Sequence, residues 1–231
     1  MKKGKKYVEA LSKIDKTKSY NVTDAIKLVK ETSTTKFDST VEVALKLNVD
    51  ARKQDQQLRG SLVLPNGSGK SKRILVIAKG EQAEIAKKLG ADFVGDKDIC
   101  EKIKNEHWLD FDIVVATPDM MAEVGKLGTI LGPRGLMPNP KTGTVTPKVE
   151  NVINDIKKGM LEYRTDSFGN VHSIIGKVSF DEKKLEENLR YIVSVIKKNK
   201  PSAVKGSLIE NIIISTTMGP GIRIDKNSFD N

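Results

Sequence analysis

The chain has 231 residues, enough for one or two domains with a real hydrophobic core, and its net charge of +10 predicts a surface that attracts polyanions, nucleic acid first. With one cysteine and two histidines, the composition excludes an intramolecular disulfide and a Cys/His zinc site, and it fits a reducing cytosol. No apolar run reaches the roughly 18 residues that span a membrane, and the lysine-rich N-terminus lacks the apolar core of a signal peptide, so we expect a soluble protein that stays inside the cell.

Two helices and two strands are predicted before residue 65. Apolar residues at helical spacing within 1–20 predict a basic helix, and a second helix is expected over about 24–31, with Asn21 or Thr23 as its N-cap. Apolar and polar residues alternate over 41–49, which predicts a half-buried strand. A second strand near 58–64 is expected to pair with it as a hairpin. The lysines of the first helix form either a solvated face or an arm that contacts phosphates: Lys2, Lys3, Lys5, Lys6, Lys13, Lys16 and Lys18.

After a turn at 65–71, strands alternate with helices. Mostly apolar runs predict buried strands at 73–78 and 111–116, and a short strand is expected at 91–94. Amphipathic runs predict helices at 81–89, 98–108, 118–124 and 149–156. Such alternation is typical of a parallel sheet with crossover helices, and a last strand is expected around 144–146.

Glycine and proline interrupt every helical or strand period between Lys126 and Val145. We therefore predict a long, shaped loop there, held by its apolar residues and presenting Arg134 and Lys141.

Antiparallel patterns resume in the last third of the chain. Strands over 161–165 and 171–180 are predicted as a hairpin, followed by a strongly amphipathic helix over 181–198. The last two strands, at 208–215 and 222–224, are joined by a turn that contains two glycines.

The two outer segments each supply too few strands to fold alone, so we predict that they join. The expected fold class is a discontinuous α+β domain, an antiparallel sheet with helices, built from residues 1–66 and 160–231. Residues 67–159 would form an inserted α/β domain of three layers with a mostly parallel, Rossmann-like sheet. The two connections between the domains are expected to act as a hinge, at Asn66, Gly67, Gly159 and Met160.

The entry to the strand at 41–49 carries groups suited to RNA. Lys36 and Phe37 precede the strand, and Thr40 and Glu42 share its outward face. A hydroxyl and a carboxylate so placed can bond ribose hydroxyls and base edges. The alternatives are that Phe37 anchors the loop to the core and that the strand face is simply solvated.

The turn at 216–221 is the second candidate. Thr217 offers a hydroxyl, Met218 a flexible apolar group that can pack on a sugar or base, and Gly219 a close backbone approach. A plain turn is the alternative interpretation. Aromatic residues make up only 5% of the chain, so contacts with RNA backbone, phosphate and sugar should outweigh stacking.

The segment Gly67–Ser71 ends in Gly-Lys-Ser, as a phosphate-binding loop does. The first glycine of that motif would fall on Leu64, and a strand rather than a helix is predicted to follow. A nucleotide-dependent enzyme using this loop is the alternative to a binding protein. Neither His107 nor His172 has a candidate nucleophile beside it in the pattern.

Four motifs occur in the same order along nearly the whole chain. They are Phe37-Asp-Ser-Thr-Val-Glu42, Val114-Val-Ala-Thr-Pro-Asp119, Leu131-Gly-Pro-Arg-Gly-Leu-Met-Pro-Asn-Pro-Lys141 and Thr216-Thr-Met-Gly219. On these motifs the chain closely resembles the bacterial family of the first large-subunit ribosomal protein, the protein of the lateral (L-one) stalk. Ser39, where many members of that family have Glu, departs from the pattern.

The resemblance implies a non-enzymatic component of the large ribosomal subunit in the cytoplasm, monomeric when free and without cofactor or metal. The outer domain would bind large-subunit ribosomal RNA and often its own messenger as a translational repressor, and the mobile inserted domain would form the stalk beside the exit-site tRNA. A ribosomal component and a free repressor share one surface, so both roles stay open. Carried over by position, the RNA contacts would be Lys36, Phe37, Thr40, Glu42, Thr217, Met218 and Gly219, with Thr216, His172 and Lys177 as further candidates and Arg134 and Lys141 as secondary contacts to RNA or tRNA.

Overall fold

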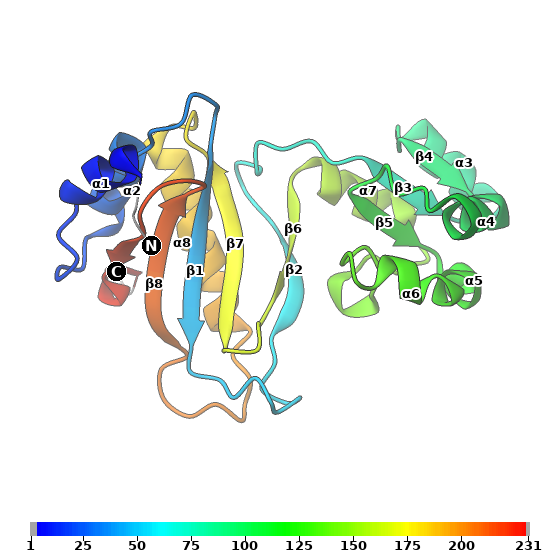
Figure 1. Ribbon diagram of the computed structural model, residues 1–231. Helices are drawn as coiled ribbons and strands as arrows, with labels where there is room; N and C mark the ends of the chain where they lie inside the picture. The colour runs from blue at the N-terminus through cyan, green and yellow to red at the C-terminus, as the bar shows by residue number, and fades with distance from the viewer. Residues whose placement is uncertain (1–3, 230–231) are drawn as a thin grey trace. The chain divides into compact units, whose positions relative to one another are not determined.

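The computed structural model describes residues 4–229 (Figure 1), so Lys2 and Lys3 of the predicted basic helix lie outside the described residues. The chain folds into two compact units. The first unit is built from both ends of the chain, up to Gly69 and from Leu161 onward, and the second unit is Lys70–Met160. Each unit has its own cluster of buried apolar side chains.

A four-stranded antiparallel sheet, in the order β7-β1-β8-β9, forms the centre of the first unit. Its strands are β1 (Thr40–Leu47), β7 (Asn170–Lys177), β8 (Ile209–Thr216) and β9 (Ile222–Ile224). The apolar residues of β1 are at most 1% exposed, as the alternation predicts: Val41, Val43, Leu45 and Leu47. The helices that pack against the strands are α2 (Val22–Glu31) and α8 (Glu182–Lys198) (Figure 1).

Two short helices also belong to the first unit. The helix α1 (Lys5–Ser12) precedes α2, and the short 3-10 helix η3 (Lys226–Phe229) follows β9. Asn21 precedes α2, but its side chain makes no capping hydrogen bond. The helix is instead held by burial of its apolar face, because Ala25 and Val29 are completely buried.

Strands β2 (Arg59–Val63) and β6 (Met160–Arg164) form a separate two-stranded sheet, so both predicted hairpins are wrong. β1 does not pair with β2 because β7 and β8 occupy both of its edges. The turn between β6 and β7 closes only on a bridge between Thr165 and Val171 within the described chain. Thr165 is instead hydrogen-bonded to the residue that precedes β2, because its amide donates to the carbonyl of Leu58 at 2.9 Å.

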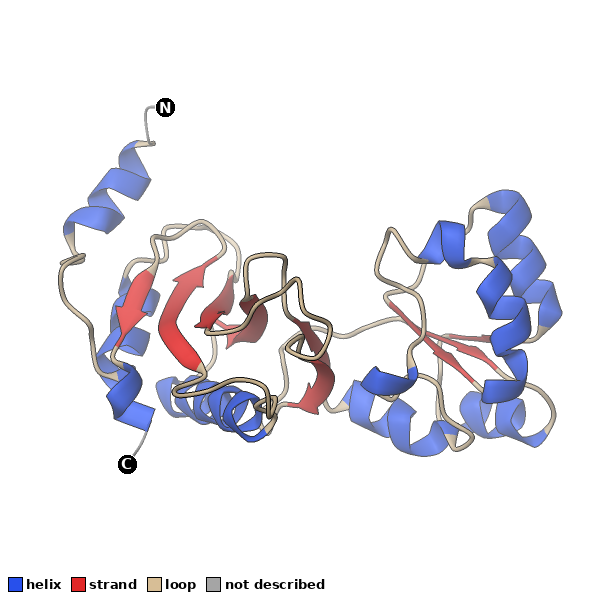
Figure 2. Cartoon of the chain, turned by 90° about the horizontal axis from the view of Figure 1, so that it is seen from below, coloured by secondary structure: helices blue, strands red, loops and turns tan. Residues whose placement is uncertain are grey.

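A three-stranded parallel sheet, in the order β4-β3-β5, forms the centre of the second unit. Its strands are β3 (Ile74–Ile77), β4 (Phe93–Gly95) and β5 (Ile113–Ala116). Helices lie on both sides of this sheet (Figure 2): α3 (Glu81–Lys88), α4 (Lys97–Glu106), α5 (Met121–Lys126), α6 (Gly128–Leu131) and α7 (Val149–Lys157). The mixture of helices with one antiparallel and one parallel sheet agrees with the predicted α+β and α/β character.

The stretch between Lys126 and Val145 contains more helix than predicted. It holds α6 and the 3-10 helix η2 (Pro140–Thr142), and a further 3-10 helix, η1 (Pro118–Met120), leads into α5. Burial of Leu131 in the core outweighs the cost of glycine in so short a helix. The strand expected around 144–146 is reduced to a bridge between Val145 and Ala116, because Pro147 cannot continue the ladder.

Asp166 fixes the turn between β6 and β7, and this predicts a pH-dependent stability. Its carboxylate accepts from the amides of Asn170 and Phe168 at 2.7 and 2.8 Å, and these bonds, that of Asn170 above all, lower its pKa from 3.8 to about 2. Because the folded pKa lies below the ordinary one, the stabilisation is present above pH 3.8 and is lost as the pH falls to about 2. Asp166→Asn should lower the free energy of unfolding by about 1 kcal/mol at neutral pH, a figure reduced for solvent screening.

Urea titrations of the wild type and of Asp166→Asn at a series of pH values measure this effect. The difference between the free energies of unfolding of the two proteins should begin to shrink below pH 3.8 and vanish only once the pH has fallen through about 2. All other carboxyls are common to both proteins, so the difference reports on Asp166. A difference that stays constant with pH would show that the charge of Asp166 contributes nothing.

Candidate nucleic-acid interface

The predicted contact residues gather where β1 begins. Thr40 pairs with Lys177 of β7, and Val41 pairs with Thr216 of β8. The loop that leads into β1 and the turn that follows β8 therefore lie at one end of the sheet, although Thr40 and Thr217 are 177 residues apart in sequence. The antiparallel register thus brings two of the predicted segments together.

Thr217 ties the turn to β1. Its amide donates to the carbonyl of Thr40 at 3.1 Å, and its hydroxyl accepts from the amide of Thr40 at 3.2 Å. Thr216 is buried, and the amide of Gly219 donates to its carbonyl at 3.0 Å. A Cβ at Gly219 would collide with Oγ1 of Thr216, so glycine alone fits without a shift of that side chain. The turn is consequently a fixed surface.

Phe37 and Met218 flank a groove at this end of the sheet. Their side chains are 59% and 63% exposed, which is unusual for large apolar groups that lie close together. The groove has a volume of about 560 Å³ and is also lined by Gly4, Lys6, Tyr7, Thr34, Thr35 and Lys36. A ribose or base can pack on the ring and the thioether while the lysine ammonium groups meet phosphates.

Lys177 acts within the protein at this end of the sheet. Its ammonium group donates to the hydroxyl of Thr40 at 2.9 Å and to the carbonyl of Asp38 at 3.5 Å. The carboxylate of Asp38 accepts from the hydroxyl of Ser179 at 2.7 Å, and this bond lowers its pKa. These contacts hold the loop before β1 against the end of β7.

Glu42 and His172 lie farther along the face of the sheet that the helices leave open. Glu42 is exposed and pairs with Ile174 and Ser215, beside an irregularity of β1. His172 is exposed opposite Ala44, and its Nε2 lies 3.5 Å from Oδ2 of Asp166. Both line a shallow pocket of about 300 Å³, so the structure places them beside the groove residues rather than among them.

Arg134 and Lys141 belong to the second unit. Arg134 is exposed between α6 and η2, and Lys141 is exposed within η2. The side chain of Asn139 accepts from the amide of Lys141 at 2.8 Å and fixes the start of that turn. Both cations are presented to solvent on ordered backbone.

Several other candidates take no part in a site. β3 rather than a helix follows the segment Gly67–Ser71, so a helix N-terminus is missing where a phosphate-binding loop needs one. His107 is not helical as predicted: it ends α4 in the left-handed conformation, with φ of 51°. Cys100 is buried, and burial raises the pKa of its thiol. Residues 4–229 contain no cluster of three or more metal-binding side chains, and none of their helices has the length and apolar character needed to span a bilayer.

The groove residues not expected from the sequence are Gly4, Tyr7 of α1 and the threonines Thr34 and Thr35. Their local pattern gives no sign of this role, because only the packing of α1 beside the loop places them there. The lysines of α1 remain open to either of the predicted interpretations, a solvated face or a phosphate-contacting arm.

An exposed apolar pair bordered by lysines, on a chain with a net charge of +10, is the arrangement of a nucleic-acid-binding protein. A family model described as the Ribosomal protein L1p/L10e family matches residues 29–220, which is more than half of the chain. The chain belongs to this family, and the resemblance seen in the sequence is confirmed. It is accordingly a structural protein of the large ribosomal subunit that binds ribosomal RNA in the cytoplasm, and the family is one of structural, non-enzymatic proteins.

Proposed function

We propose that the first unit binds ribosomal RNA through the end of the sheet where β1 begins. The contact surface, called the RNA rim below, consists of Lys36, Phe37, Thr40, Thr217, Met218 and Gly219. The observation that carries the proposal is the exposure of Phe37 and Met218 across one groove, on backbone that the Thr40–Thr217 hydrogen bonds hold in place.

The other predicted contact residues have supporting roles in this proposal. Thr216 is buried and shapes the turn, and Lys177 orients the hydroxyl of Thr40. Glu42 and His172 extend the surface along the open face of the sheet. A rigid rim of hydroxyls, backbone groups and one aromatic ring recognises RNA by shape, while lysines supply affinity that depends on salt.

We also propose that the two units are the predicted domains and that the second moves as the lateral stalk near the exit-site tRNA. Asn66 and Gly67 are bonded to Asn188 of α8, so in the first connection we place the bend after them, at Gly69, whose φ is +71°. Gly159 and Met160 provide the return connection. Arg134 and Lys141 would then be contacts to RNA or tRNA.

A second proposed role is repression of the protein's own messenger. The RNA rim recognises a shape, so a messenger that folds into the same shape would compete for it. This role uses the same residues and needs no further site.

Crosslinking tests the function directly. A photoreactive benzoylphenylalanine at Phe37, compared with the same group at the exposed Phe168, should link ribosomal RNA from position 37 alone in washed large subunits. Equal linking from both positions would contradict the RNA rim. In the ribosome-free fraction, linking of the protein's own messenger from position 37 supports the repressor role, and failure to link it refutes that role.

A further inference from the structure

The two threonines of the RNA rim use their hydroxyl groups in different ways. The hydroxyl of Thr217 is occupied in both directions, because it accepts from the amide of Thr40 at 3.2 Å and donates to the carbonyl of the same residue at 3.4 Å. Its one hydrogen is therefore used within the protein, and the side chain holds the turn against β1. The hydroxyl of Thr40 makes none of these bonds, since Thr217 is bonded to the backbone of Thr40 alone.

Lys177 determines what the hydroxyl of Thr40 can offer a ligand. An ammonium group has only hydrogen-bond donors, so in the 2.9 Å bond between them the oxygen of Thr40 is the acceptor. The hydroxyl hydrogen is left over, and within residues 4–229 no group accepts it. Thr40 is half-buried at the very start of β1, with its side chain on the outward face. It consequently presents a hydrogen-bond donor at the rim.

The charges around Thr40 favour an anionic acceptor. Lys177 uses one N–H on the hydroxyl of Thr40 and a second on the carbonyl of Asp38 at 3.5 Å, which leaves one of its three donors. In the described part of the chain Lys177 forms no ion pair, because the carboxylate of Asp38 accepts instead from the hydroxyl and the amide of Ser179. Glu42 is the next outward side chain, about 7 Å farther along β1. The ammonium group is therefore the charge closest to the free hydroxyl hydrogen.

We infer that Thr40 and Lys177 together hold one backbone phosphate of the RNA. The inference rests on the proposed function of the RNA rim and adds to it the group that these two residues recognise. A non-bridging phosphate oxygen carries no proton, so it accepts from the hydroxyl of Thr40 and from the remaining N–H of Lys177 at once. A ribose hydroxyl can also accept a bond, but it has no charge to match the ammonium group. Lys177 thus directs the hydroxyl of Thr40 and supplies the charge.

Support of the loop before β1 is the alternative role for Lys177. Its bond to the carbonyl of Asp38 is long for a hydrogen bond, and shorter bonds already hold the same loop. The hydroxyl of Ser179 donates to the carboxylate of Asp38 at 2.7 Å, and the amide of Val178 donates to the carbonyl of Ser39 at 3.0 Å. A lysine that served the loop alone would leave the salt dependence of RNA binding unchanged when it is replaced.

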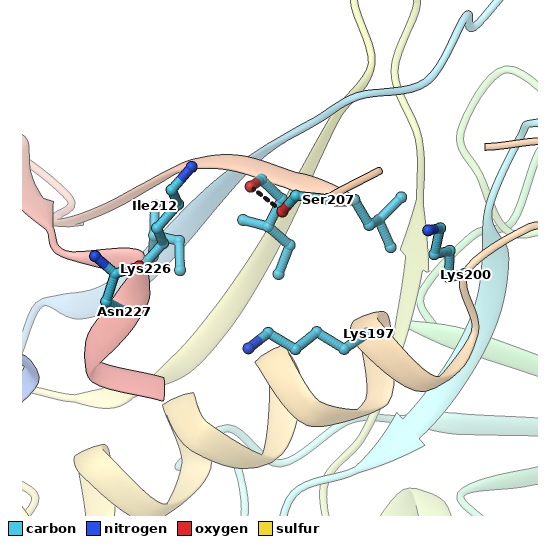
Figure 3. A pocket seen from close by; sticks show the side chains of 8 residues that line it. Lys197, Lys200, Ser207, Ile212, Lys226 and Asn227 are labelled. Carbon is cyan, nitrogen blue, oxygen red and sulfur yellow. Dashed lines mark hydrogen bonds between the residues drawn. The ribbon is translucent and has the colours of Figure 1, made fainter. Parts of the chain in front are cut away.

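A double-variant cycle tests the inference. Thr40→Val removes the hydroxyl and keeps the shape of the side chain, Thr40→Ser keeps the hydroxyl, and Lys177→Met removes the charge. Lys226→Met is the matched control, because Lys226 is exposed and lines a pocket where β8 begins (Figure 3), whereas the RNA rim lies where β8 ends. The dissociation constant for deproteinised large-subunit ribosomal RNA is measured for each protein over a range of salt concentrations, together with its thermal melt.

Thr40→Val should bind roughly 10- to 100-fold more weakly at one salt concentration, whereas Thr40→Ser should bind as the wild type does. Lys177→Met should make the slope of log affinity against log salt shallower by about one relative to Lys226→Met, since one phosphate contact is lost. When Lys177→Met is already present, Thr40→Val should cost no more than about 3-fold, because the phosphate is no longer held at the hydroxyl. The melting temperatures should not differ.

Two results overturn the inference: losses from Thr40→Val and Lys177→Met that simply multiply, or a slope for Lys177→Met equal to that of the control. Either result leaves the RNA rim in place. The variant Phe37→Ala/Met218→Ala is measured alongside, and because its charge is unchanged it should lose affinity with the slope of the wild type. If that variant binds like the wild type, the RNA rim itself fails.

Discussion

Asn188→Leu is expected to lower the free energy of unfolding of the first unit by about 2 to 4 kcal/mol. Asn188 is completely buried in α8. Its Nδ2 donates to the carbonyls of Ile175 and Gly67 at 2.7 and 3.1 Å, and its Oδ1 accepts from the amide of Asn66 at 3.1 Å. Leucine fits the space but leaves all three backbone groups without this partner, and each buried one costs about 1 to 3 kcal/mol.

Urea titration with two probes measures this loss. Trp108 is the only tryptophan and belongs to the second unit, so its fluorescence follows that unit, whereas far-ultraviolet circular dichroism follows both. Asn188→Leu should shift part of the dichroism transition to lower urea and leave the Trp108 midpoint in place. Asn154→Leu, at an exposed position of α7, is the control. A loss below about 1 kcal/mol would contradict the argument for Asn188, and a Trp108 midpoint that moves equally would show that the units unfold together.

Asn188 also shows what a pattern can and cannot reveal. It lies on the apolar stripe of α8, three residues after Leu185 and four before Ile192, where an amide stands out. The burial of Asn188 agrees with its place on this stripe. Its partners come from β7 and from the loop after β2, and no local pattern contains them.

Strand pairing was the least predictable part of the fold, for the same reason. Alternation in β1 gives the two faces of the strand, and the structure confirms that Val43 and Leu45 face the core. It contains no information about neighbours, so sequence proximity favoured β2 as the partner. In the structure β1 pairs with β7 and β8 instead. A strand with a continuous apolar face buries that face best at the centre of a sheet.

Helix prediction failed where glycine and proline were given too much weight, and it also carried the helix expected over 98–108 past its end at Glu106. The segment Gly128–Leu131 was expected to be loop, yet it forms α6. A glycine in a helix costs about 1 kcal/mol relative to alanine. The burial of Leu127 and Leu131 in the core outweighs this cost.

The residues of the proposed RNA rim could be named from the sequence, but their arrangement as one surface could not. Phe37 and Met218 were identified from their chemistry and from family motifs, and the register of β1 with β8 then brings them to one groove. The hydroxyl of Thr217 was expected to face RNA, whereas it is bonded to the backbone of Thr40. A change at Thr217 would thus alter the protein as well as the contact, and the exposed pair gives the cleaner experiment.

The double variant Phe37→Ala/Met218→Ala is expected to bind large-subunit ribosomal RNA roughly 30- to 150-fold more weakly, a loss of about 2 to 3 kcal/mol. Both side chains are mostly exposed in the free protein, so their removal opens no cavity and the unfolding midpoint should not change. The lost affinity would reflect the area that the ring and the thioether bury against a sugar or base. Filter binding at one fixed salt concentration, with a thermal melt of each protein, measures both quantities.

Phe168→Ala provides the matched control for this experiment. Phe168 is 76% exposed on the turn before β7, at the end of that strand opposite Lys177. The Phe168→Ala variant therefore removes an exposed ring of the same kind from the same unit. It should bind RNA as the wild type does. If the double variant stays within about two-fold of the wild type, the RNA rim is misplaced; if Phe168→Ala is the variant that loses affinity, the RNA lies at the other end of the sheet, beyond Asp166.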